Sequence, residues 1–149
     1  MAGKRQAEAR RWYQQATFDL EAAAWNIQGG FHDTACFLAQ QAGEKALKSL
    51  LYYQGARREA LFSHSLVEMV QEVAKTVDTV SKLEEPAREL DLHYIPSRYP
   101  NGLPAGYPHR FYDRQTADRA LEAAGRIVGA VRGFFQARSE TGILSTDEP

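Results

Sequence analysis

The sequence predicts an all-α fold, an antiparallel up-and-down bundle of four to five helices with a proline-rich loop before the last one. Apolar residues recur every three or four positions through most of the 149 residues, which is the period of an amphipathic helix. The first helical segments are joined by very short connections, so they must lie antiparallel. The length and the 44% hydrophobic content fit one domain, which we expect to span residues 1–138.

Two long helices are expected at the start of the chain. The first runs from about residue 5 to 28 and ends at Gly29-Gly30, because glycine readily adopts the left-handed conformation that closes a helix. The second runs from about residue 31 to 54, and Gly55 follows it. With only two or three residues between them, these helices should form a hairpin.

A charged connector at residues 56–60 precedes the third predicted helix. Ser65 and Glu68 have the spacing of a capping box, in which the serine hydroxyl caps an early backbone N–H and the glutamate reaches back. The helix that follows carries valines at helical spacing as far as Val80. The spacing is that of a helix, although β-branched residues lower helix propensity.

A fourth helix is predicted over residues 81–95, and Pro96 ends it by restricting the residue before it. Four of the six prolines fall in residues 96–114, which predicts a loop without regular helix. A loop of this length is usually functional or disordered, and its interleaved aromatic and arginine residues favour function. The last helix is expected over residues 115–138, followed by a frayed tail at 139–149.

The net charge of −1 excludes polybasic or acidic tails and disordered linkers. The charge is unevenly distributed, with −5 over residues 59–91 and +2 over residues 92–114, and such asymmetry can focus an anionic ligand. No apolar run approaches the roughly 18 residues of a membrane helix, and the N-terminus lacks the pattern of a secretory signal. We therefore expect a cytoplasmic protein without membrane contact.

The single cysteine, Cys36, agrees with a reducing compartment, and its helical context predicts a small buried hydrophobe. The four histidines are far apart from one another, and with a single cysteine they do not form the paired Cys/His pattern of a structural zinc site. We therefore expect neither a metal site nor a cofactor.

Three groups of residues are candidates for chemistry. On the second helix, Gln41, Glu44 and Lys48 share one face, with Lys45 beside them. This face is either solvated, with an ordinary Glu44–Lys48 pair, or a polar strip that lines a groove in which the lysines bind phosphate.

The proline-rich loop supplies the second group. Arg98-Tyr99 and Arg110 combine guanidinium groups for phosphate with nearby aromatic faces for bases, the two needs of a nucleotide or single-stranded RNA site. The alternative is a packed lid, whose aromatic residues cover the end of the bundle.

The third group is Arg88 and His93, separated by four residues. Such a pair can cleave RNA without metal: the imidazole transfers a proton at the ribose 2′-oxygen and the guanidinium stabilises charge on the phosphate. The alternative is structural, with Arg88 paired to Glu84 or Asp91 and His93 packed on a neighbour.

Three segments in this order resemble the HEPN domain family (higher eukaryotes and prokaryotes nucleotide-binding): ACFLAQQAGEKALK at 35–48, HSL at 64–66 and LHYIPSRYP at 92–100. The resemblance covers about residues 7–138. It implies a helical bundle, commonly dimeric, that binds nucleotide or RNA. Prokaryotic members often work beside a minimal nucleotidyltransferase in a two-component or toxin–antitoxin type module. Many relatives in the wider superfamily are metal-independent ribonucleases with an Arg-x(4–6)-His motif.

Arg88 and His93 correspond best to that motif, although Glu89 and Tyr94 depart from the usual ribonuclease pattern. The leading hypothesis is therefore a nucleotide- or RNA-binding homodimer with a minimal nucleotidyltransferase-like partner. An endoribonuclease using the Arg/His pair and a non-catalytic helical interaction module remain as alternatives. The expected binding residues are Lys45, Lys48, His64, Arg98, Tyr99 and Arg110.

Overall fold

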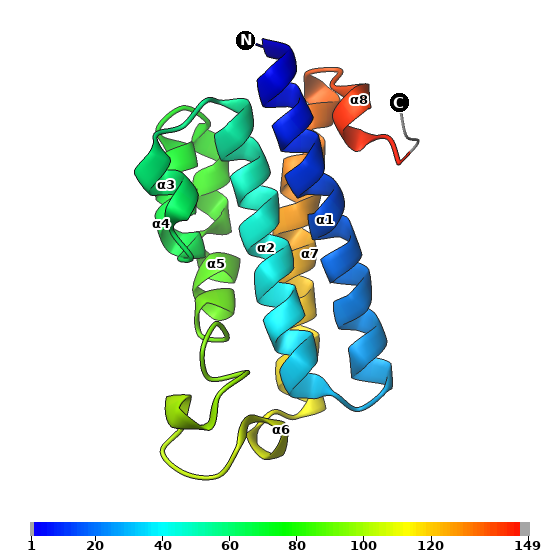
Figure 1. Ribbon diagram of the computed structural model, residues 1–149, viewed down its shortest axis with the longest axis vertical. Helices are drawn as coiled ribbons and strands as arrows, with labels where there is room; N and C mark the ends of the chain where they lie inside the picture. The colour runs from blue at the N-terminus through cyan, green and yellow to red at the C-terminus, as the bar shows by residue number, and fades with distance from the viewer. Residues whose placement is uncertain (1, 147–149) are drawn as a thin grey trace.

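The computed structural model describes residues 2–146 and confirms the all-α fold, with no strand in that range. Figure 1 shows α2 in the middle of the molecule, α1 on one side of it, α3–α5 on the other and α7 behind. The α-helices are α1 (Ala2–Gln28), α2 (His32–Tyr53), α3 (Arg58–Phe62), α4 (Leu66–Ala74), α5 (Glu84–Asp91), α6 (Pro108–Phe111), α7 (Arg114–Ala137) and α8 (Thr141–Leu144). Two 3₁₀ turns, η1 (Asp78–Leu83) and η2 (Pro100–Gly102), lie between them.

The predicted hairpin of α1 and α2 is confirmed, and these two helices form the most extensive contact in the fold. Gly30 closes the turn with a φ of +84°, a conformation that favours glycine. Small side chains let the two backbones approach closely. The buried alanines of these helices are Ala9, Ala16, Ala23, Ala35, Ala39, Ala42 and Ala46.

On its other sides α2 packs against α7, α4 and α5. Gly43 is a point of close approach in this packing. A Cβ atom placed there would lie 2.7 Å from Leu66 Cδ2 of α4 and 2.8 Å from Leu90 Cδ1 of α5. The helix that carries the polar face is therefore held in place from three directions.

The start of α4 follows the predicted cap in part. Ser65 Oγ accepts from the Glu68 backbone N–H at 3.2 Å, as expected. The Glu68 carboxylate does not reach back to Ser65: it accepts from Ser63 Oγ, while the Ser65 N–H donates to that same hydroxyl. The predicted connector 56–60 also differs, because residues from Arg58 onward form the short helix α3.

The third and fourth helices are shorter than the pattern predicts. Helix α4 ends at Ala74, and Val77 is outside the helical conformation, with a φ of −130° and a ψ of 89°. Helix α5 ends at Asp91, well before Pro96. The Asp91 carboxylate instead bonds the first turn of α4, accepting from the backbone N–H of Leu66 at 2.7 Å.

The loop and the tail are also more ordered than expected. Pro100 and Pro108 each begin a short helical turn, since proline is tolerated at the first helical position where no N–H is needed. Residues 139–146 are not frayed: α8 lies against α1, and Gln14 Nε2 donates to the Ile143 carbonyl at 2.8 Å. The rest of the predicted tail, 147–149, lies outside the described residues.

Within residues 2–146, no helix is both long enough and apolar enough to cross a membrane.

Candidate functional site

One face of α2 carries a continuous polar and aromatic strip. Phe37, Gln41, Glu44, Lys48 and Tyr52 are spaced by four, three, four and four residues, so all five lie on the same side of the helix. At 1.5 Å per residue the strip is about 22 Å long. We call these five residues the α2 strip.

Glu44 is the centre of the strip, and its carboxylate is fully engaged. Oε2 accepts from Lys48 Nζ at 3.1 Å, and Oε1 accepts from Gln40 Nε2 at 3.2 Å. The same Oε1 lies 3.3 Å from His64 Nδ1. The side chains of Glu44 and Lys48 are only 5% and 6% exposed. A buried ion pair is stable only when such hydrogen bonds complete it, so this network fixes both side chains and orients His64.

At the Phe37 end of the strip, rings from α2 and from residues 94–99 surround a guanidinium group. Arg98 Cζ lies 4.3 Å from the ring centroid of Phe37, 4.7 Å from that of Tyr94 and 5.0 Å from that of Tyr99. The His64 ring stacks on Tyr94 at 4.8 Å and 18°. We call Phe37, His64, Tyr94, Arg98 and Tyr99 the Arg98 cluster.

Arg98 is held in the cluster without a carboxylate. Its Nε donates to the Tyr94 carbonyl at 2.9 Å, and its terminal nitrogens make no hydrogen bond or ion pair within residues 2–146. The side chains of His64 and Tyr99 are about half exposed. The cluster therefore presents guanidinium N–H donors and ring faces together, which suits a group that combines phosphate with an aromatic base.

None of the remaining predicted binding residues contacts Arg98 in the described residues. Lys45 Nζ is paired with Asp19 Oδ2 at 2.6 Å, on the side of α2 that faces α1. Lys48 is buried and paired with Glu44, so its ammonium group does not point into solvent. Arg110 is exposed on α6, and its side chain makes no hydrogen bond or ion pair in the described part of the chain.

The structure does not bring Arg88 and His93 together. Arg88 is exposed and lies 3.5 Å from Glu84 across one turn of α5. His93 is buried, with Nδ1 3.1 Å from the Tyr112 hydroxyl, and Nε2 has no hydrogen-bond partner in the described residues. Burial lowers the pKa of His93, partly offset by the charge of Glu89. These positions match the structural alternative given by the sequence, in which Arg88 pairs with Glu84 and His93 packs on a neighbour.

Cys36 is fully buried, as predicted. Burial raises the pKa of its thiol to about 12, with nearby carboxylates such as Asp33 adding to the shift. The thiol is therefore protonated at neutral pH and a poor nucleophile. In the part of the chain that the structure describes, no three His, Cys, Asp or Glu side chains are grouped so that they could hold a metal ion.

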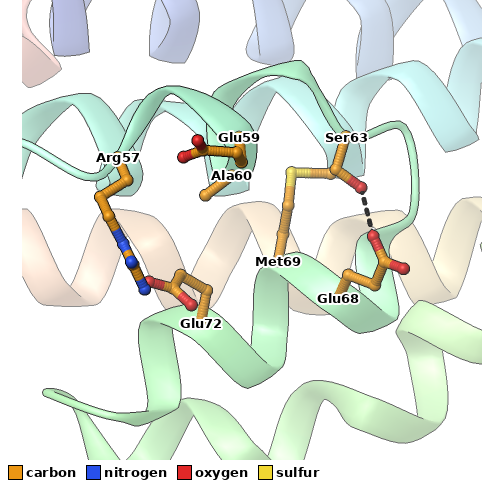
Figure 2. Close-up of a pocket in the computed structure, with 7 residues that line it drawn as sticks. All are labelled: Arg57, Glu59, Ala60, Ser63, Glu68, Met69 and Glu72. Atoms are coloured by element: carbon orange, nitrogen blue, oxygen red, sulfur yellow. Dashed lines mark hydrogen bonds between the residues drawn. The ribbon is translucent and has the colours of Figure 1, made fainter.

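A hollow of about 320 Å³ lies between α3 and α4 (Figure 2), and none of the residues that line it belongs to the Arg98 cluster. Its charged lining is mainly acidic, with three carboxylates against the single guanidinium of Arg57. Figure 2 shows the Ser63–Glu68 hydrogen bond at its edge. An excess of carboxylates repels phosphate, so this hollow is a poor candidate for a nucleotide.

Aromatic residues of the site were missed by the sequence reasoning. Phe37 and Tyr52 lie on the same helical face as Glu44, so their spacing could have placed them in the strip. Nothing in the local pattern indicates that Tyr94 would lie between His64 and Arg98, because that depends on how the loop folds back onto α2.

A model of the HEPN domain matches residues 9–134. The chain belongs to the HEPN domain family. No curated protein matches it.

Three solved structures are similar to this HEPN domain over 85% of its chain. The protein TT1696 from Thermus thermophilus is 38% identical, with a TM-score of 0.78 and 97% of its own chain covered. ST0689, an archaeal HEPN homologue, is 35% identical, with a TM-score of 0.70 and 96% coverage. A HEPN domain protein from Thermotoga maritima (TM0613) is 28% identical, with a TM-score of 0.67 and 98% coverage.

The three sequence segments that carry the HEPN resemblance meet at one place in the fold. The first supplies Phe37 and Glu44, the second supplies His64, and the third supplies Tyr94 and Arg98. These are the contacts of the α2 strip with the Arg98 cluster, which makes this region of the HEPN domain the candidate functional site.

Proposed function

We propose that this HEPN domain binds a nucleotide or single-stranded RNA at the Arg98 cluster. The observation that carries the proposal is the guanidinium of Arg98, which lies among three ring faces and has no carboxylate partner within residues 2–146. Guanidinium groups bind phosphate through two parallel N–H donors, and exposed rings stack with bases.

Two further features support this function. Residues 92–114, which supply Tyr94, Arg98 and Tyr99 to the cluster, have a net charge of +2 although the whole chain is at −1, and such asymmetry favours an anionic ligand. His64 is oriented by Glu44 through Nδ1, which leaves the opposite edge of a half-exposed ring for a phosphate or base. No observation favours cleavage by Arg88 and His93, so the proposal is limited to binding.

The test is calorimetric titration of the purified protein with adenosine 5′-monophosphate and with a short single-stranded oligoadenylate. We expect Arg98→Ala to weaken binding by about tenfold or more, the order of effect of one lost charge-assisted bidentate contact. Arg98→Lys should restore only part of the affinity, because lysine keeps the charge but lacks the planar fork.

The matched control is Arg126→Ala, which removes an exposed arginine of α7 that has no ion pair in the described residues. Arg126→Ala should bind both ligands with the affinity of the original protein. Equal affinity in Arg98→Ala and in the control would contradict the proposal, provided that both variants melt at the temperature of the original protein.

The proposal includes a homodimer. Phe18 and Trp25 lie seven residues apart on one face of α1, and their side chains are 54% and 74% exposed. An exposed apolar surface of this kind supports contact with a second copy. Sedimentation equilibrium should give twice the mass of one chain and should give a monomer for Trp25→Glu; a monomeric original protein would contradict the dimer.

The proposal also includes a minimal nucleotidyltransferase-like partner, in a two-component module of the toxin–antitoxin type, supported by the sequence resemblance. The first check is whether a small nucleotidyltransferase gene lies next to the gene of this chain. The second is whether the two purified proteins elute together in size-exclusion chromatography. Separate elution at micromolar concentrations would contradict a stable complex.

A further inference from the structure

A hollow of about 500 Å³ lies between α1 and α2, at the Tyr52 end of the α2 strip and therefore at the opposite end from Phe37 and Arg98. A volume of this size is within the range of small-ligand sites. None of the predicted binding residues except Lys45 lines it. Its lining residues are Glu8, Arg11, Trp12, Gln15, Lys45 and Tyr52.

Two parallel rings form one wall of the hollow. Trp12 and Tyr52 stack with their centroids 5.6 Å apart and their planes at 21°. Lys48 Nζ lies 5.4 Å from the centroid of Trp12, and the buried pair with Glu44 fixes its position. Trp12 is therefore held on α1 and Tyr52 on α2, with Lys48 of the ion pair that orients His64 beside the Trp12 ring, and both rings stay partly exposed to solvent.

Positive charge without a partner lies next to these rings. A second hollow of about 310 Å³ shares Glu8 and Tyr52 with the first and is also lined by Lys4 and Arg5. Neither Lys4 nor Arg5 makes a hydrogen bond or ion pair within residues 2–146. The neighbouring carboxylate of Glu8 is already paired with Arg11.

Arg5 lies against Gly55, the glycine that follows α2. Gly55 has a φ of +67°, and a Cβ atom placed there would lie 2.6 Å from Arg5 Nη2. The guanidinium therefore lies directly against the turn after α2, beside the Trp12–Tyr52 wall. An aromatic wall and two uncompensated cations are the two parts that a nucleoside phosphate requires, one for the base and one for the phosphate.

We infer that the Trp12–Tyr52 hollow is a second nucleoside-phosphate subsite, in which the base stacks on these rings and the phosphate binds Lys4 and Arg5. The ligand is a free nucleotide or one nucleotide of a single strand. The second of these rests on the proposed function, because a strand that lies along the α2 strip reaches the Arg98 cluster about 22 Å away.

Tryptophan fluorescence tests the subsite directly. The chain has two tryptophans, and Trp25→Phe leaves Trp12 as the only one while keeping an aromatic side chain on α1. We expect adenosine 5′-monophosphate or a six-nucleotide oligoadenylate to quench the Trp12 emission in a saturable manner. The double variant Lys4→Ala/Arg5→Ala in this background should weaken that binding by about tenfold and reduce its dependence on salt.

The matched control is Lys82→Ala, which removes an exposed lysine of η1 that has no ion pair in the described residues. It should leave the quenching curve unchanged. Quenching that is absent, or equally strong in the double variant and in the control, would overturn the inference. Lys4 and Arg5 are both exposed, so their replacement does not disturb the core, and a thermal melt confirms the fold.

The two sources of the ligand and the two proposals remain distinguishable. If the oligonucleotide binds more tightly than the mononucleotide and Arg98→Ala removes only that difference, the ligand is a strand along the α2 strip. If the two bind equally well, the ligand is a free nucleotide. Loss of calorimetric binding in Arg98→Ala without any response of Trp12 overturns the subsite and leaves the proposed function. If Trp12 responds to the ligand and Arg98→Ala leaves the total binding unchanged, the proposed function at the Arg98 cluster is overturned and the subsite remains.

Discussion

At the scale of single residues, His93 shows how burial decides the role of a titratable group. Its position in the sequence suggested proton transfer, but its ring is enclosed and contacts the Tyr112 hydroxyl, 19 residues further along the chain. A buried imidazole is stable in the neutral form, because its environment cannot solvate the positive charge. His93 therefore links the segment after α5 to the end of the proline-rich loop, just before α7.

This environment predicts a dependence of stability on pH. Burial lowers the pKa of His93 below its ordinary value of 6.5 in the folded protein, so the unfolded chain takes up the proton first as the pH falls. The free energy of unfolding should therefore decrease as the pH falls below about 6.5. In His93→Gln, urea unfolding at pH 7.5, 6.5 and 5.5 should show a smaller decrease; equal pH dependence in both proteins would contradict this role.

At the scale of elements, Gly43 sets the distance between α2 and the pair α4–α5. We expect Gly43→Ala to lower the free energy of unfolding by about 1–2 kcal/mol, because overpacking exceeds the gain of about 1 kcal/mol in helix propensity. The matched control is Gly125→Ala on α7, where an added Cβ meets no atom within 4 Å. Urea unfolding should show the control to be as stable as the original protein or more so, and equal effects of the two substitutions would contradict the close approach at Gly43.

Helices were predictable from the sequence where their stability is local. The spacing placed α1, α2 and α7 to within a few residues, because each has more than 20 residues of regular apolar pattern. The same spacing predicted a fourth helix that continues past Asp91. In the structure the Asp91 carboxylate caps α4, so the end of this helix depends on a contact between elements. The polar face of α2 was predictable in the same way, whereas the surroundings of Arg98 depend on the path of the loop.

At the scale of the whole molecule, the C-terminal segment closes one end of the bundle. Ile143 of α8 is 2% exposed, and Gln6 Nε2 donates to the Glu140 carboxylate at 2.9 Å. A short sequence with few apolar residues gave no sign of this contact, because it combines one buried side chain with hydrogen bonds from Arg10 and Gln14 to backbone carbonyls, and such bonds leave no pattern in the sequence.

We therefore expect Ile143→Ala to destabilise the protein by about 2–4 kcal/mol, the usual cost of emptying a buried aliphatic site. Thermal unfolding followed by circular dichroism measures the loss. Thr146→Ala is the control, since Thr146 is exposed at the end of the described residues. A melting temperature for Ile143→Ala equal to that of this control would show that α8 does not contribute to the fold.

The short turn at Gly29-Gly30 also has a consequence for the order of folding. It makes the most extensive helix contact of the fold one between neighbours in the chain, so little loop entropy is lost when that contact forms. Low contact order speeds folding, and the α1–α2 hairpin is the natural nucleus on which α7 and α4–α5 condense. The α2 strip, which joins the two sites that we propose to bind nucleotides, is thus built into the part of the molecule expected to form first.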